Sequence, residues 1–177
     1  NQDALELAAR FAAGQKNWRV VLKYLDQMEI TKRADLLLMK ATALQLTGLK
    51  DESVKCARHA EDALRNMQNS VTTGADRIRY SIAVSLSLQR RFEQAVDWMM
   101  KSTEGRLNNE DRQVLGGIYL SWSRHLKDQS AMDPMKVLAM LEKGIQISPE
   151  SQDIIMAFLN DCEELNTTPE ERRRHVE

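Results

Sequence analysis

Apolar residues recur along most of the chain at the three- and four-residue spacing of an amphipathic helix. Glycine, asparagine or aspartate separates the periodic segments, and only three prolines interrupt the chain. The pattern predicts about ten helices in five pairs. The predicted pairs are residues 3–14 with 17–29, 33–47 with 50–67, 75–89 with 92–104, 109–127 with 133–147, and 151–166 with 170–176.

Residues typical of helix ends support these boundaries. Gly14 is placed to end the first helix, and Asn17 is placed to cap the second. Thr168 and Pro169 form a start signal for a last helix, with two acidic residues following in its first turn. That helix would stop within two turns, and the chain begins at Asn1 without methionine. We therefore expect a processed chain or a fragment of a longer protein.

The segment from residue 78 to residue 88 carries a competing pattern. Six apolar residues alternate there with arginine, serine and alanine: Ile78, Tyr80, Ile82, Val84, Leu86 and Leu88. Alternation of this kind is typical of a half-buried strand. The sequence offers no second convincing strand, and an isolated strand leaves its backbone groups unpaired. A helix with a wide apolar surface accommodates the same residues, so we predict a helix.

The first four predicted hairpins each carry a small or slim residue in both helices. Those in the first helices are Ala9, Ala41, Ala83 and Gly116. Those in the second helices are Val21, Ser53, Ala95 and Val137. Antiparallel helices approach to ~8–10 Å only where the side chains at the crossing are small. We therefore expect the two helices of each hairpin to cross closely at these positions.

Two local motifs resemble the tetratricopeptide repeat (TPR). Leu115-Gly116 followed by Tyr119 is similar to the family's Leu-Gly-x-x-Tyr, and Phe92 with Ala95 is similar to the start of its second helix. The resemblance implies an all-α, right-handed α-solenoid of about four to five antiparallel helical hairpins. It implies a single helical-repeat domain over residues 1–177, with hairpins at about 3–29, 33–67, 75–104, 109–147 and 151–176.

The repeat spacing is uneven. The small residues of successive first helices lie 32, 42 and 33 residues apart, whereas the family period is about 34. The extra length falls in a loop near residues 68–74, and a second insertion lies around residues 128–133. Other helical-hairpin solenoids with periods near ~40 residues also fit, so an α-solenoid is the broader prediction.

Charge and composition narrow the classes of partner. The formal net charge is −1, from 25 basic and 26 acidic residues, without the basic excess that nucleic-acid binding usually needs. No apolar run approaches the ~18 residues that cross a membrane, so we expect no nucleic-acid partner and no membrane insertion of this segment. Two distant cysteines, Cys56 and Cys162, favour reduced thiols. The cytoplasm is the favoured compartment, although a targeting segment could have been removed.

Residues that carry chemistry are sparse. Cys56 and His59 lie three apart on one predicted helix and could face the same way. Zinc takes three or four ligands, and a Cys–His nucleophile needs a cleft and an orienting group. No glycine-rich phosphate loop, serine-nucleophile motif or zinc helix motif is present. We therefore predict a protein that is not an enzyme, with no catalytic residue, no metal and no cofactor.

In the resembled family, the first helices of the hairpins line a concave surface that holds peptides or helices of partners. Mapped by register, the candidate groove residues are Glu6, Arg10, Leu38, Thr42, Gln45, Arg77, Tyr80, Val84 and Gln113. Interface hot spots favour arginine and tyrosine, so Arg77 and Tyr80 are the preferred contacts. Leu38, Tyr80 and Val84 could instead belong to the core between repeats. Some family members hold a C-terminal carboxylate with lysine and asparagine, but Glu6 and Arg10 occupy those positions here.

We predict a non-catalytic scaffold that binds a peptide or helix of a protein partner on its concave face. The alternative is a structural or assembly segment that packs against other domains of its own chain or self-associates. Apolar residues near both ends motivate this alternative, because the terminal repeats of a solenoid need a cover. These residues are Leu5, Leu7, Phe11, Ile154, Ile155, Phe158 and Leu159.

Overall fold

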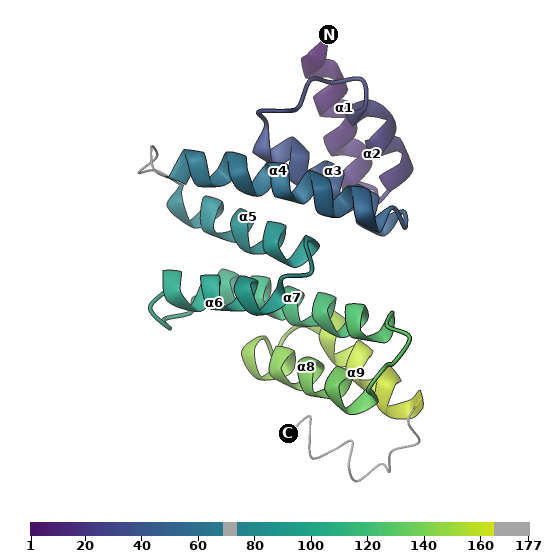
Figure 1. The fold of residues 1–177 in the computed structure, drawn as a ribbon, viewed down its shortest axis with the longest axis vertical. Helices are drawn as coiled ribbons and strands as arrows, with labels where there is room; N and C mark the ends of the chain where they lie inside the picture. Colours follow the sequence, from purple (N-terminus) through teal and green to yellow (C-terminus); the bar gives the residue numbers. More distant parts are fainter. Residues whose placement is uncertain (69–73, 165–177) are drawn as a thin grey trace. The chain divides into compact units, whose positions relative to one another are not determined.

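The computed structural model describes residues 1–68 and 74–164, which form nine α-helices and no strand (Figure 1). The helices are α1 (Gln2–Gly14), α2 (Trp18–Leu25), α3 (Ala34–Leu46), α4 (Lys50–Gln68), α5 (Ala75–Leu88), α6 (Phe92–Ser102), α7 (Asn109–Lys127), α8 (Pro134–Ile147) and α9 (Gln152–Glu164). The all-α prediction is confirmed for these residues. The predicted helix at 170–176, with its start signal at Thr168 and Pro169, lies outside them.

Capping side chains fix the start of two helices in the second half of the chain. The Asn108 side chain accepts a hydrogen bond from the Asp111 amide, and the Asp111 carboxylate accepts one from the Asn108 amide. This reciprocal pair forms a capping box, and α7 has the bounds that the sequence predicts. Asp133 caps α8 with a single hydrogen bond, which its side chain accepts from the Met135 amide, and Pro134 occupies the first helical position.

Among the helices whose predicted ends lie within the described residues, two end at least two residues earlier than predicted. α2 ends at Leu25 rather than at residue 29, because the next amides turn back in a tighter i→i+3 pattern, from Gln27 to the Tyr24 carbonyl. The turn carries Ile30 into the core, where it is 7% exposed. α6 ends at Ser102 rather than at residue 104, because Glu104 already has a φ of 50° in the left-handed region.

The segment with the strand-like alternation is helix α5. Ile78, Ile82 and Leu86 recur at intervals of four, so one face of the helix buries all three. Val84 lies off that face and is 37% exposed. The helical prediction is confirmed because burial follows the helical period rather than the alternation.

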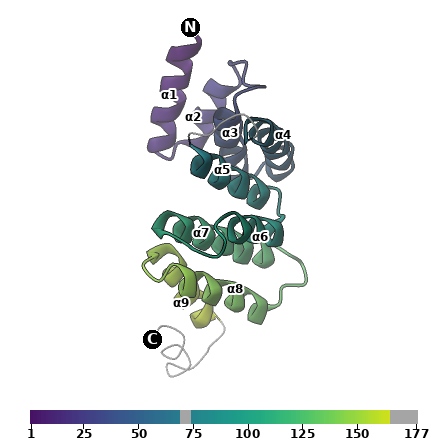
Figure 2. The same ribbon diagram turned by 90° about the vertical axis from the view of Figure 1, so that its left-hand side faces the viewer.

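The chain divides into two compact units, Asn1–Arg91 and Phe92–Glu177. In the first unit, α1 pairs with α2 and α3 with α4, while α2–α3, α4–α5 and α3–α5 contacts join the pairs. In the second unit, α7 packs on α6 and α8, and α9 packs on α8 and α7, as Figure 2 also shows. Helices thus pack mainly on their sequence neighbours, as in a helical array. The third predicted hairpin spans the boundary between the units, so the pairing of its helices stays a prediction.

The small residues expected at helix crossings are all buried. At the α3–α4 crossing, the Ser53 hydroxyl donates to the Ala41 carbonyl at 2.7 Å, which confirms the predicted close approach. Ser85 does the same between α5 and α4, donating to the Ala57 carbonyl at 2.6 Å. A side chain as short as serine reaches a neighbouring helix backbone only where the two helices lie very close together.

Gly116 lies at a close contact of a different kind from the predicted one. A Cβ atom at this position would lie 2.9 Å from Ile154 Cδ1 and 3.0 Å from Ser148 Cβ. The expected neighbour was Val137 on α8, but the nearest atoms belong to α9 and to the turn before it. The glycine therefore makes room for α9, the fourth helix of the second unit.

Helix α3 has no solvent face through most of its length. From Leu36 to Gln45 no residue is exposed, and six residues of the helix are buried: Ala34, Leu36, Leu37, Ala41, Ala43 and Leu44. α2, α4 and α5 all contact this helix. It is the central helix of the first unit, which explains why apolar residues occur on every side of it.

A buried carboxylate fastens α4 to α5. The Glu61 side chain is 8% exposed and accepts hydrogen bonds of 2.8 Å from Arg65 Nε, Gln89 Nε2 and Arg91 Nη1. Burial raises the pKa of Glu61, but the hydrogen bonds from Gln89 and Arg65 and the charge of Arg91 outweigh this effect. The pKa of Glu61 therefore lies below its usual value, and the folded chain favours the charged carboxylate.

Candidate functional site

Eight of the nine predicted groove residues lie in the first unit. Glu6 and Arg10 are on α1; Leu38, Thr42 and Gln45 are on α3; and Arg77, Tyr80 and Val84 are on α5. Gln113 is exposed on α7 in the second unit. Within the first unit, the predicted groove residues therefore come from α1, α3 and α5.

A pocket of about 570 Å³ lies in the first unit and is lined by α1, the start of α3, the end of α4 and the start of α5. We call it the α3/α5 pocket. Arg10 and Arg77, both predicted groove residues, line it together with Lys32 and Arg33. Buried apolar side chains form its floor: Ala34, Leu64 and Ile78. The pocket thus combines a basic rim with an apolar floor.

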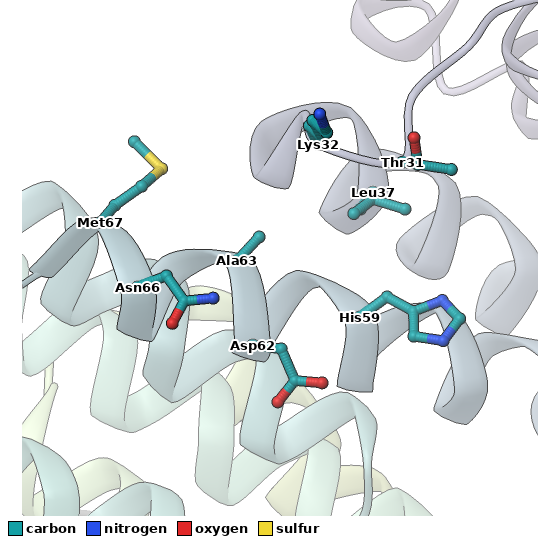
Figure 3. Close-up of a pocket in the computed structure, with 8 residues that line it drawn as sticks. All are labelled: Thr31, Lys32, Leu37, His59, Asp62, Ala63, Asn66 and Met67. Carbon is teal, nitrogen blue, oxygen red and sulfur yellow. The ribbon is translucent and has the colours of Figure 1, made fainter.

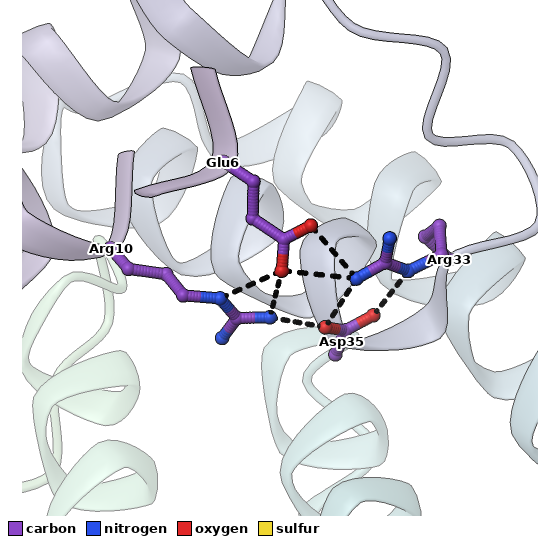
Figure 4. A network of polar contacts seen from close by, with 4 residues as sticks. All are labelled: Glu6, Arg10, Arg33 and Asp35. Carbon is purple, nitrogen blue, oxygen red and sulfur yellow. Dashed lines mark hydrogen bonds and ion pairs between the residues drawn. The ribbon is translucent and has the colours of Figure 1, made fainter. Parts of the chain in front are cut away.

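Four charged side chains close a network beside this pocket (Figure 4). Glu6 binds both guanidinium groups, with Arg10 Nη2 at 2.7 Å and Arg33 Nη2 at 3.1 Å. Asp35 completes the square, with Arg10 Nη2 at 2.5 Å and Arg33 Nε at 3.3 Å. The hydrogen bond from Arg10 is the main cause that holds the pKa of Glu6 below its usual value. The two arginines and two carboxylates cancel in charge, and the network ties α1 to the start of α3.

Two further cations at the α3/α5 pocket are not neutralised. Within residues 1–68 and 74–164, neither Lys32 nor Arg77 has an acidic partner, and both are exposed. The pocket also receives the first turns of α3 and α5, whose N-caps, Arg33 and Gly74, provide no side-chain hydrogen bond to the helix amides. Helix N-termini carry partial positive charge, so they add to the surplus from the two cations.

Four other predicted groove residues are less accessible to a partner. Leu38, Thr42, Gln45 and Tyr80 are half-buried, and the Thr42 hydroxyl donates to the Leu38 carbonyl of its own helix at 2.9 Å. The Gln45 Oε1 atom is buried without a hydrogen-bond partner among the described residues. The Arg79 guanidinium lies 5.0 Å from the centre of the Tyr80 ring. Of the two preferred contacts, Arg77 is therefore the more accessible.

A second hollow, of about 540 Å³, lies along α4 and is shown in Figure 3. His59 and Asp62 line it from α4, while Lys32 and Met67 line both this hollow and the α3/α5 pocket. Cys56 does not join His59 there, because it is half-buried and its thiol donates to the Leu37 carbonyl at 3.2 Å. Within the described part of the chain, no three His, Cys, Asp or Glu side chains gather where they could hold a metal ion.

Mapping by helix register missed the segment before α3, which supplies Lys32 and Arg33 to the pocket. These residues lie in a connection, and the register rule considers only helical positions. A signal was available in the sequence, because two adjacent basic residues stand at a predicted helix start. The pairing of Glu6 with Arg10 could also have been foreseen from their spacing of four.

The apolar residues expected to seek a cover behave differently at the two ends. Leu7 and Phe11 on α1 are 71% and 68% exposed, in agreement with that expectation. Ile154 and Phe158 on α9 are 1% and 0% exposed, so the expectation was wrong for them. α9 packs that face onto α7 and α8 and fills the core of the second unit. Three residues of the set are half-buried: Leu5, Ile155 and Leu159.

No protein-family model matches the chain, and no curated protein matches it in sequence. Among the helices of the described ranges, none combines the length and the apolar character needed to cross a membrane. The fold class therefore comes from the structure itself: an all-α chain whose helices pack mainly on their neighbours in sequence.

Proposed function

We propose that this chain is a TPR-like α-solenoid segment that binds a peptide or helix of a partner protein and is not an enzyme. The helical-hairpin pattern, the resemblance of its local motifs and the sequential packing of its helices support the solenoid. Such arrays use an extended surface of their first helices for binding. No cofactor or metal is part of this proposal.

One observation carries the binding proposal. Arg10 and Arg77, chosen from the register of two different hairpins, line one pocket with an apolar floor. Its volume of about 570 Å³ lies in the range of ~300–1,000 Å³ that is common for binding pockets. Arginine at the rim of an apolar depression is typical of protein interfaces. We therefore assign partner binding to the α3/α5 pocket.

Site-specific photo-crosslinking in source lysate tests this assignment. A benzoylphenylalanine replaces Ser81, which lines the pocket, or Ser87, a half-buried serine of the same helix that does not line it. We expect a partner to crosslink through position 81 and not through position 87. The crosslink should disappear with Arg77→Glu and persist with Arg58→Glu, which reverses an exposed charge on α4 away from the pocket. Identical crosslinks from both serine positions, or none from position 81, would refute the proposal.

The exposed apolar pair on α1 favours a second function, assembly. Leu7 and Phe11 lie one turn apart and are the most exposed large apolar residues of the first unit. Burying both in a contact with another copy or domain would stabilise that contact by about 3 kcal/mol or more. Light scattering over a concentration series tests self-association, with Leu7→Ser/Phe11→Ser as the variant and Met135→Ser as the control for an exposed apolar residue elsewhere. A strict monomer at every concentration would exclude self-association.

A further inference from the structure

The charge at the α3/α5 pocket is unequally distributed. The network of Glu6, Arg10, Arg33 and Asp35 is neutral in itself, because each carboxylate contacts both guanidinium groups. The pocket's surplus therefore resides on Lys32 and Arg77, one from the connection before α3 and the other from the first turn of α5. A ligand that supplies a negative charge there would complete the electrostatic balance of the site.

The apolar floor of the pocket favours a ligand that also carries an apolar group. Ala34, Leu64 and Ile78 are 5%, 5% and 8% exposed, and they leave an apolar surface between the cations. A strongly hydrated polyanion would gain little from that surface and would meet the carboxylate of Asp35 at the same rim. A peptide that carries a carboxylate beside an apolar side chain matches both the rim and the floor.

The volume limits the conformation of such a ligand. A helix with its side chains is about 10–12 Å across, which is too wide to enter a hollow of about 570 Å³ as a whole. One acidic and one neighbouring apolar side chain of an extended or turn-shaped segment would fit. The partner would then anchor at a few residues, in the manner of a short linear motif.

We propose that the α3/α5 pocket binds an acidic segment of a partner protein, with an aspartate or glutamate carboxylate held by Lys32 and Arg77 and the adjacent apolar side chain on the floor. This inference rests on the proposed function and adds the chemistry of the partner. Arg10 and Arg33 are held in place by their carboxylates, so they form a fixed wall of the site rather than its anion-binding groups.

Fluorescence anisotropy with defined peptides tests the inference on the intact chain. The probe is a labelled, end-capped decapeptide of alternating glutamate and leucine, and its control has glutamine in place of every glutamate. We expect the glutamate peptide to bind at least about tenfold more tightly than the glutamine peptide, because only the former offers charge to the two cations. Raising the ionic strength from about 0.05 M to about 0.5 M should weaken this binding.

Charge-reversal variants locate the binding. Arg77→Glu and Lys32→Glu should each lower the affinity for the glutamate peptide by about tenfold or more. Arg58→Glu should change this affinity by less than about twofold. Equal loss with Arg58→Glu would reveal non-specific attraction and overturn the inference. Equal binding of the two peptides, or binding of neither, would overturn it as well.

The crosslinking experiment separates this inference from the proposed function. A partner captured through position 81 whose crosslinked segment contains no aspartate or glutamate would contradict the acidic chemistry and leave partner binding intact. Absence of a crosslink through position 81 would refute the proposed partner binding, regardless of the affinities measured for the two peptides.

Discussion

Replacing Gly116 by alanine tests whether α9 depends on close approach to α7. The new Cβ would lie 2.9 Å from Ile154 Cδ1 and 3.0 Å from Ser148 Cβ, closer than such atoms normally come. Ile154 is 1% exposed and Ser148 is 0% exposed, so neither can move freely into solvent. Gly117, the next residue on the same helix, would place a Cβ in open space and is the matched control.

The two variants share one effect and differ in another. Alanine favours the helix over glycine by about 1 kcal/mol at either position. Overpacking in a buried contact destabilises by about 1–3 kcal/mol, and only Gly116→Ala suffers it. We therefore expect Gly117→Ala to be more stable than the wild type by up to about 1 kcal/mol. Gly116→Ala should be less stable than Gly117→Ala by about 1–3 kcal/mol.

Urea unfolding, followed by circular dichroism and by tryptophan fluorescence, measures the difference. With a slope of about 2 kcal/mol/M, a gap of 2 kcal/mol separates the two midpoints by about 1 M. Ile154→Val removes the nearest atom and should partly rescue Gly116→Ala, since Ser148 Cβ remains in place. Equal midpoints for the two alanine variants would refute the reasoning that Gly116 is required for the approach of α9.

Three further outcomes follow from the first unit. Ser53→Ala removes the hydrogen bond to the Ala41 carbonyl and should lower the free energy of unfolding in urea by about 1 kcal/mol, whereas Ser121→Ala on the exposed face of α7 should leave it within about 0.5 kcal/mol. Glu61→Gln should destabilise by about 1–3 kcal/mol at neutral pH, because the hydrogen bonds to the charged carboxylate are weakened. Since the folded pKa of Glu61 is lowered, its contribution is present above the unfolded pKa and is lost as the pH falls through the folded pKa. Urea midpoints of wild type and Glu61→Gln should therefore converge as the pH is lowered through the folded pKa of Glu61, and a constant gap would contradict this account. Burial raises the pKa of the Cys56 thiol, so alkylation by iodoacetamide at about pH 8, followed by mass spectrometry, should be slow in the folded chain and fast in denaturant.

Helix boundaries could be predicted from the sequence where capping residues determine them. α7 has the predicted bounds because Asn108 and Asp111 satisfy its first amides regardless of distant contacts. The end of α2 could not be predicted from local sequence. Nothing in residues 26–29 forbids a helix, and the chain turns there because burying Ile30 is worth more than another helical turn. Tertiary packing overrides local preference at that point.

Only some of the residues that line the candidate site could be predicted from the sequence. Register selected Arg10 and Arg77, and both line the α3/α5 pocket, because the helical period determines which side chains of one helix share a face. Lys32 and Arg33 come from a connection whose path depends on how α2 and α3 pack, and no periodicity reports that path. The neutral network was also hidden, since the contact of Glu6 with Arg33 joins residues on different elements.

The absence of a solvent face on α3 has a consequence for how this chain tolerates sequence change. In a helix with a polar stripe, substitutions to charged residues are accepted at roughly every third or fourth position. Along α3, no residue from Leu36 to Gln45 is exposed, and the single charged one, Lys40, is half-buried and paired with Asp26 at 2.7 Å. Intolerance of new charges should therefore extend over the other nine residues of this stretch. In a saturation mutagenesis profile, the amphipathic helices of the first unit should accept polar substitutions on their exposed faces. The stretch in α3 should accept mainly apolar substitutions that keep the volume of the side chain.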